Sequence, residues 1–195
     1  LHPDWTLAHA YALSPDLLAM SHVWQSPAQR SPVVAAKGSP EAVADLCHLP
    51  PERVDEIRRQ TEALAAQGLR VLGVARGGLD GHQPGADWPA IQHDLDFEFL
   101  GLVGLMDPLR PAVAEAVQLC RQAGIRVAMI TGDYPATALA IAAQAGIDTQ
   151  GGALRGEEIA ALSEADLSER VRQTQVFARV TPEQKWRIVR ALQAH

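Results

Sequence analysis

The sequence predicts an α/β protein in two parts, in which an α+β first half precedes a second half built on a parallel sheet. In the second half, apolar runs alternate with helix-forming segments, an order typical of parallel strands joined by crossover helices. These runs are apolar throughout, as expected for strands covered by helices on both faces. The first half instead has short apolar runs separated by Ser-Pro pairs, which favours antiparallel strands. We place the boundary near residue 97, which gives parts 1–97 and 98–195.

The first half is expected to consist of strands flanked by helices. Ser39 is the predicted N-cap of the first helix, with Pro40 at its first position. The second helix has an apolar stripe and is followed by Gly68, which suits a C-terminal cap. The expected strands are 5–13, 17–24, 32–36 and 69–75, the second helix is 51–67, and a loop rich in Gly, Pro and Asp covers 77–90.

The second half is expected to alternate strands and helices. Gly124 and Gly146 follow two helix-forming segments and are predicted to end them. Thr181 and Gln184 form a predicted capping box for the last helix, whose first residue is Pro182. The expected strands are 99–106, 125–130 and 175–180, and the expected helices are 111–123 and 135–145, with two short ones between 156 and 172.

The composition favours a soluble globular protein, since 47% of the 195 residues are apolar and 21% are charged. A net charge of −6 without any Lys/Arg-rich run argues against nucleic acid as a partner. No apolar stretch approaches the roughly 20 residues that span a bilayer, and no signal peptide is visible. Cys47 and Cys120 are predicted to be reduced core residues. Because both ends are abrupt, we expect an excised piece of a longer protein.

Three loops are predicted to meet at one rim of the parallel sheet, since ligands bind beyond the carboxyl ends of its strands. They comprise residues 107–110, 131–133 and 179–185. Together these loops offer guanidinium and ammonium groups, carboxylates, a small hydroxyl and a glycine amide. That set suits a phosphate group with a divalent cation close by.

Each of these features could also have a purely structural role that involves no ligand. Residues 131–133 could be an ordinary turn and helix cap, and Arg110 could be a surface salt-bridge partner. Lys185 lies in the first turn of a predicted helix, where a cation opposes the helix dipole by about 0.3–1 kcal/mol, a conflict that a bound anion would remove. Lys37 and Gly38 lie at a strand-to-helix junction, where they could meet a phosphate or an adenine ring or could simply precede a capped helix.

Four segments resemble motifs of the P-type cation-transporting ATPases, in the order of that family. They are Lys-Gly-Ser-Pro-Glu from Lys37, Asp-Pro-Leu-Arg from Asp107, Gly-Ile-Arg-Val-Ala-Met-Ile-Thr-Gly-Asp from Gly124, and Phe-Ala-Arg-Val-Thr-Pro-Glu-Gln-Lys from Phe177. An ordered set is far more specific than one short motif. The resemblance implies an incomplete α+β nucleotide-binding domain over 1–97 and an incomplete parallel-sheet, haloacid dehalogenase-like phosphorylation domain over 98–195.

The resemblance implies that one group of residues binds nucleotide. Lys37, with Gly38 beside it, would border the adenine pocket, and Arg70 would reach toward the nucleotide phosphates. Asp107 and Arg110 would lie at the junction between the domains, near the nucleotide. Arg179 would approach the ribose.

A second group would handle the transferred phosphoryl group. Thr131 and Gly132 would hold it, and Asp133 would help to orient the nucleotide and the loop. Lys185 would neutralise the phosphoryl oxygens in the transition state, which fits a reaction catalysed mostly by positioning and electrostatics. The implied cofactors are ATP and Mg²⁺, with no metal ligand in this fragment.

The chain also departs from the family pattern. The nucleophile motif Asp-Lys-Thr-Gly-Thr and the Mg²⁺-binding motif Gly-Asp-Gly-x-Asn-Asp are absent, so the fragment itself is expected to be inactive. Leu13 and Leu18 occupy the positions of an adenine-stacking phenylalanine and a following lysine, which predicts weak nucleotide binding. Without the nucleophile strand, the strand at 125–130 would have an unpaired apolar edge, through which the fragment could dimerise.

The resemblance further implies a cytoplasmic portion of an integral membrane protein, in the plasma or inner membrane, that moves a cation through a missing membrane domain. Calcium-type pumps look most similar. Two alternatives remain at this point. A haloacid dehalogenase-like phosphatase needs Asp-x-Asp directly after a strand, whereas Asp94 and Asp96 precede the predicted strand. A non-catalytic nucleotide-binding module is the other alternative.

Overall fold

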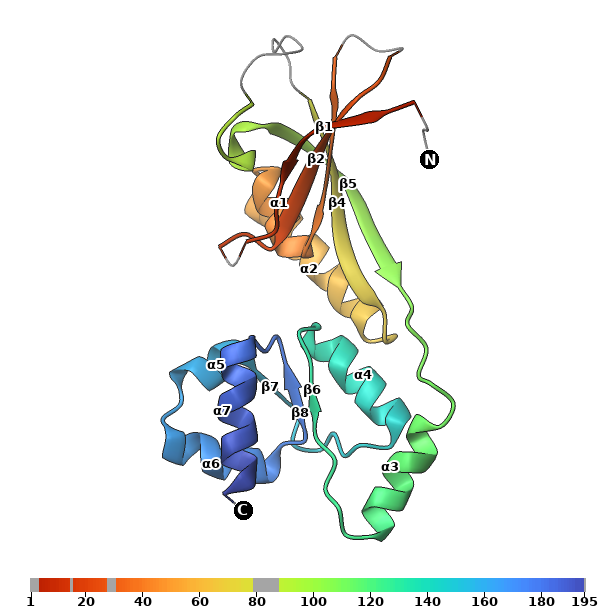
Figure 1. The fold of residues 1–195 in the computed structure, drawn as a ribbon, viewed down its shortest axis with the longest axis vertical. Helices are drawn as coiled ribbons and strands as arrows, with labels where there is room; N and C mark the ends of the chain where they lie inside the picture. The colour runs from red at the N-terminus through yellow and green to blue at the C-terminus, as the bar shows by residue number, and fades with distance from the viewer. Residues whose placement is uncertain (1–3, 15, 28–30, 79–87, 195) are drawn as a thin grey trace. The chain divides into compact units, whose positions relative to one another are not determined.

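The computed structural model describes residues 4–14, 16–27, 31–78 and 88–194. Two compact units divide the chain, the first made of residues 1–61 and 71–105 and the second of 62–70 and 106–195 (Figure 1). This division comes after Leu105, later than the boundary expected near residue 97. Most of the loop expected at 77–90 lies outside the described residues.

The first unit is built on a five-stranded sheet in the order β1-β2-β3-β4-β5. The pairs β1–β2, β2–β3 and β3–β4 are antiparallel, which confirms the strand arrangement predicted for this half. The strands are β1 (Thr6–Tyr11), β2 (Ala19–Gln25), β3 (Val33–Gly38), β4 (Arg70–Gly78) and β5 (Asp96–Leu105), and the helices are α1 (Pro40–Leu46) and α2 (Pro51–Ala65), with a short 3₁₀ turn at Gln92–Asp94.

Helix α1 begins where the sequence predicts and covers one face of this sheet. The Ser39 hydroxyl accepts a hydrogen bond from the Ala42 backbone N–H at 3.2 Å, which confirms the predicted N-cap. Val43 and Leu46 of α1 are fully buried and pack against small residues of β2, β3 and β4. The core of the first unit therefore lies between α1 and the sheet.

The prediction of an apolar strand at 99–106 in the parallel sheet of the second half is wrong, because residues 99–105 belong to β5. It is instead the edge strand of the first sheet. The reason is its alternation, since Phe97 and Phe99 pack into the first unit's core whereas Asp96, Glu98 and Leu100 are exposed. A strand with one buried and one exposed face suits an antiparallel sheet, not a sheet covered on both faces.

The second unit contains a three-stranded parallel sheet in the order β6-β8-β7, as predicted for this half. Its largest core cluster surrounds Phe177 of β8, which is fully buried. The strands are β6 (Met129–Ile130), β7 (Ala153–Arg155) and β8 (Val176–Ala178), and the helices are α3 (Val113–Gln122), α4 (Pro135–Ala145), α5 (Gly156–Ala161), α6 (Glu164–Gln173) and α7 (Pro182–Gln193). The sequence did not predict β7, whose three residues are too few for a recognisable apolar run.

Strand β6 is much shorter than the strand expected at 125–130. Pairing begins at Met129, whose backbone N–H donates to the Gln175 carbonyl at 2.8 Å. The residues before it are held differently, because the Arg126 guanidinium donates to the backbone carbonyls of Val171 and Thr174. Among the described residues, β8 is the one strand that pairs with β6, and Ile125 is 57% exposed. Coverage of this edge by a second copy of the chain stays a prediction.

A single arginine joins three helices of the second unit. Arg187 of α7 donates to the carbonyls of Ile159 and Leu162 at the end of α5, at 2.8 Å each. Its Nε also donates to the Glu164 carboxylate at the start of α6, at 2.7 Å. Arg187 thereby fixes the corner between α5 and α6 against α7.

No helix in the described part of the chain is long and apolar enough to cross a bilayer. Both cysteines are free, as predicted, but they are half-buried and not the core residues that the sequence suggested.

Burial at the end of α1 raises the pKa of the Cys47 thiol from 9.0 to about 11. A raised pKa favours the neutral folded form, so this contribution to stability is complete below pH 9 and is lost as the pH rises toward 11. At pH 8 we expect iodoacetamide to alkylate Cys47 in a Cys120→Ser variant roughly 100-fold more slowly in the folded than in the urea-unfolded protein, because only the thiolate reacts. Equal rates, followed by mass spectrometry, would contradict the burial of this thiol.

Candidate functional site

Two of the three loops predicted to form a rim are joined by main-chain hydrogen bonds. Beyond the last residues of β6 and β8, the Thr131 N–H donates to the Phe177 carbonyl at 2.9 Å, and the Val180 N–H donates to the Thr131 carbonyl at 3.1 Å. The Arg179 N–H donates to the Asp133 carbonyl at 3.1 Å. The structure therefore brings residues 131–133 and 179–180 together at the carboxyl ends of the parallel strands, and we call this region, with residues 181–185, the carboxyl rim.

Within the carboxyl rim, the hydroxyl of Thr131 is engaged by its own loop. It donates to the Asp133 carboxylate at 2.8 Å and accepts from the Asp133 N–H at 3.1 Å. Arg70 Nε lies 3.8 Å from the other carboxylate oxygen of Asp133, a long and largely exposed pair that adds little stability. Gly132 is exposed, and a Cβ there would meet open space. The loop thus holds a hydroxyl and backbone amides in a fixed turn beside an unobstructed glycine.

Arg179 adopts an unusual backbone conformation at the carboxyl rim. Its φ of +54° is left-handed, which costs a non-glycine residue roughly 1–2 kcal/mol. Its guanidinium carbon lies 5.4 Å from the centre of the Tyr134 ring, within cation–π range. Sequence reasoning missed Tyr134, because an aromatic residue before a helix-starting proline carries no functional signal by itself.

Gly156, the first residue of α5, packs closely against the carboxyl rim. A Cβ at this position would lie 2.1 Å from the Arg179 carbonyl oxygen and 2.6 Å from the Gln184 side-chain oxygen. The Gln184 side-chain amide donates to the Gly156 carbonyl at 2.9 Å, while its oxygen completes the predicted capping box with Thr181. Only glycine therefore allows α5 to pack this closely against the rim, a requirement that the sequence alone does not reveal.

Lys185 lies in the first turn of α7, as predicted, with an exposed side chain. Its N–H donates to the Thr181 carbonyl at 2.9 Å. In the same turn, backbone N–H donation and the Thr181 hydroxyl lower the pKa of the Glu183 carboxyl. The turn therefore stabilises negative charge, as expected at a helix N-terminus.

The third predicted loop does not belong to the carboxyl rim. Asp107 and Arg110 lie in an exposed segment between β5 and α3, and β5 belongs to the first sheet. In the described ranges, no hydrogen bond or ion pair joins either side chain to residues 131–133 or 179–185. This corrects the prediction that all three loops meet, and the error follows from assigning β5 to the parallel sheet.

The predicted nucleotide residues of the first half lie on the sheet. Lys37 of β3 pairs with Met20 of β2 and Val74 of β4, so these three side chains share one face. By the alternation of β4, Arg70 points to the face of Val74, and Met20 and Val74 are half-buried there. This face, which α1 does not cover, combines apolar side chains with two cations.

Gly38, the last residue of β3, allows close packing of the main chain. A Cβ on Gly38 would lie 2.4 Å from the Leu18 carbonyl oxygen, and the Ser39 N–H donates to that same oxygen at 2.8 Å. Gly38 is thus needed for close approach of the chain just before β2. Leu13 and Leu18 are 60% and 44% exposed.

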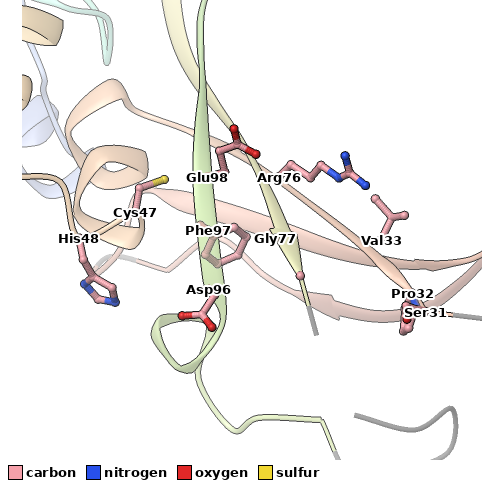
Figure 2. A pocket seen from close by; sticks show the side chains of 11 residues that line it. Ser31, Pro32, Val33, Cys47, His48, Arg76, Gly77, Asp96, Phe97 and Glu98 are labelled. Carbon is pink, nitrogen blue, oxygen red and sulfur yellow. The ribbon is translucent and has the colours of Figure 1, made fainter. Parts of the chain in front are cut away.

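Two hollows in the described part of the chain have no predicted site residue in their lining. The first, of about 770 Å³, lies in the first unit (Figure 2) and has Cys47, His48, Arg76, Asp96 and Glu98 in its lining. The second, of about 750 Å³, lies at the amino ends of β6 and β8, opposite the carboxyl rim. No group of three potential metal ligands is found in the described ranges.

A family model for haloacid dehalogenase-like hydrolases matches residues 6–195. The chain belongs to the haloacid dehalogenase-like hydrolase family. The match covers both units, and the second unit contains the parallel sheet with a Thr-Gly-Asp loop at the carboxyl end of β6.

Curated relatives of this haloacid dehalogenase-like chain are cation-transporting ATPases, which confirms the predicted relationship. The chain is 43% identical over 175 residues to "Probable cation-transporting ATPase F" of Mycobacterium tuberculosis, covering 83% of this chain and 19% of that protein. It is 44% identical over 140 residues to "Cation-transporting ATPase pma1" of Synechocystis, covering 71% and 15%. It is 35% identical over 174 residues to "Calcium-transporting ATPase 1" of Lactococcus lactis, covering 82% and 19%. The chain thus spans about a fifth or less of these relatives.

Proposed function

We propose that this chain is the ATP-handling, cytoplasmic part of a P-type cation-transporting ATPase in the plasma or inner membrane. The observation that carries the proposal is the carboxyl rim, where the Thr131–Asp133 turn and Arg179 are joined by main-chain hydrogen bonds beyond parallel strands. Backbone amides and a cation at this position suit a phosphoryl group. The names of the relatives supply the cation transport.

In this proposal the two units have separate tasks. The first unit binds the base of ATP on the sheet face that holds Lys37, with Gly38 required for the packing of that strand. Arg70, which belongs to the second unit, is directed to the phosphates. In the second unit, Thr131 and Gly132 hold the phosphoryl group, Asp133 orients the loop, and Lys185 neutralises oxygen charge. To donate to a phosphoryl oxygen, the Thr131 hydroxyl must leave the Asp133 carboxylate that it now contacts.

Further residues complete the proposed assignments. Arg179 approaches the ribose, and Asp107 and Arg110 belong to the segment that connects the two units. Mg²⁺ accompanies ATP, with its ligands in other parts of the parent protein. The 195 residues contain no Asp-Lys-Thr-Gly-Thr motif, so we propose that they do not form an aspartyl-phosphate by themselves.

The structure gives no support to the phosphatase alternative. Asp94 ends a 3₁₀ turn just before β5 and Asp96 is the first residue of β5, so both carboxylates lie at the amino end of this strand, in the first unit. A phosphatase of this family needs them at the carboxyl end of a strand of the parallel sheet.

Titration of the chain with β,γ-methylene-ATP tests the proposed nucleotide site. We expect weak binding, with Kd above micromolar, because leucines stand at positions 13 and 18. Lys37→Ala should weaken binding by roughly 10- to 150-fold, since a hydrogen bond to a charged group contributes about 1.5–3 kcal/mol. The matched control is Arg53→Ala, which removes an exposed cation of α2 and leaves binding unchanged. Equal effects of both variants would mean that Lys37 contributes only through the overall positive charge of the chain. Mg²⁺-dependent ATP turnover by the chain would contradict its proposed inactivity.

A further inference from the structure

We propose that Tyr134 is a positioning residue, which holds the guanidinium of Arg179 at the carboxyl rim so that, besides approaching the ribose, it can contact an anionic oxygen of a phosphoryl group. The inference deepens the proposed function and rests on it, because it concerns the same site. It adds a residue that neither the motifs nor the relatives assign.

The position of Tyr134 is not explained by its role in the helix. It is the N-cap residue of α4, with an extended backbone (φ −61°, ψ 143°), yet its side chain makes no cap hydrogen bond. Tyrosine is not among the residues preferred at an N-cap, where Ser, Thr, Asp and Asn accept from the first turn. What its ring does contact is the Arg179 guanidinium, 5.4 Å from the ring centre.

The backbone of Arg179 is held in its left-handed conformation from two sides. Its N–H donates to the Asp133 carbonyl, the residue just before Tyr134. Its carbonyl oxygen is packed against Gly156, where no Cβ would fit. A conformation of this kind persists only when its surroundings over-determine it, and such residues cluster at functional sites. The contact with the Tyr134 ring adds a constraint on the side chain of Arg179.

The contact is compatible with binding an anion. An arginine that contacts an aromatic ring can also bind an oxyanion, because its five N–H donors lie in the plane of the guanidinium. A phosphate group at the carboxyl rim would therefore meet a guanidinium whose long side chain is already oriented, which reduces the entropy lost on binding.

The test uses the whole chain with inorganic phosphate as the probe, read by amide and arginine Nε–H NMR signals. In the wild type, the Tyr134 ring current should shift the Arg179 Nε–H signal, and phosphate should perturb the amides of residues 131–133 and 179–180. Tyr134→Leu should remove the ring-current shift and weaken phosphate binding about two- to fivefold, the change expected from losing one cation–π contact. Tyr134→Phe should preserve both signals, because the ring remains.

The matched control is Trp186→Leu. It removes a second arginine–aromatic contact in the same unit, where Arg190 lies 4.8 Å from the Trp186 ring centre, and should leave phosphate binding unchanged. If Tyr134→Leu fails to fold, Tyr134→Phe still tests the inference. A loss of phosphate binding in Tyr134→Phe would overturn it, because the role would then belong to the hydroxyl and not to the ring. Unchanged binding in a folded Tyr134→Leu would overturn it as well.

The two proposals can fail separately. If Lys37→Ala weakens binding of β,γ-methylene-ATP but the rim gives no phosphate response, the nucleotide proposal stands and the role of Tyr134 is rejected. If the phosphate response depends on the Tyr134 ring but Lys37→Ala has no effect on the analogue, the role of Tyr134 stands and the nucleotide site must lie elsewhere.

Discussion

Replacing Gly156 with alanine is expected to lower the free energy of unfolding of the second unit by about 3 kcal/mol or more. The added Cβ would lie 2.1 Å from the Arg179 carbonyl oxygen, a main-chain atom tied into the rim by the hydrogen bond from Arg179 to Asp133. To relieve this steric overlap, α5 or the chain after β8 would have to move. The midpoint of thermal unfolding, followed by circular dichroism, should fall by about 12 °C or more.

A matched glycine is available in the same rim. Gly132→Ala adds a Cβ that meets nothing within 4 Å, and the φ of Gly132 is not left-handed. We expect this variant to unfold within about 0.5 kcal/mol of the wild type. If both variants unfold at the same temperature, the close packing of α5 against the rim is refuted.

Loss of the Arg187 side chain is expected to cost the second unit about 2–4 kcal/mol. Arg187→Ala removes the side-chain donors of the Ile159 and Leu162 carbonyls and leaves Ile159 only a longer bond of 3.4 Å from the Leu162 N–H, and poorly satisfied acceptors with low exposure are costly. The Arg187 side chain is only 22% exposed, whereas its third partner, Glu164, is 70% exposed. Most of the loss should therefore come from the two carbonyls and little from the ion pair.

Two further variants separate these contributions. Glu164→Gln removes the ionic partner alone and should cost less than about 1 kcal/mol. Arg190→Ala, three residues along the same helix, removes an exposed arginine over Trp186 and should cost a similarly small amount. Urea unfolding, with hydrogen exchange of the α5–α7 amides, measures all three. A cost for Glu164→Gln equal to that of Arg187→Ala would assign the stabilisation to the ion pair.

The sequence predicts helices better than strands in this chain, for physical reasons. Helix starts are encoded locally, so the caps at Ser39 and Thr181 and the left-handed Gly146 after α4 were all predicted correctly. Strand membership is decided by distant partners. An apolar run alone could not show that Phe97 and Phe99 belong to the first unit's core, which is why β5 was assigned to the wrong sheet.

The candidate site was predictable where motif and topology coincide. The Thr131–Asp133 turn and Arg179 follow adjacent parallel strands, so their proximity could be foreseen from strand order. The contributions of Gly156 and Tyr134 could not, because both depend on distances between segments more than 20 residues apart. The wrong placement of residues 107–110 followed directly from the wrong placement of β5.

The direct bonds between the backbones of the two rim loops have a consequence for how side chains there can vary. Amide and carbonyl groups belong to every residue, so substitutions at positions 131 to 133 or 179 to 180 can alter charge and hydrogen-bonding capacity while the main-chain bonds between the two loops remain, even where the Thr131–Asp133 side-chain bonds are lost. One scaffold can thus present different chemical groups at an unchanged location. In this part of the molecule, side-chain atoms determine which ligand is bound, whereas main-chain atoms hold together the two loops that bind it.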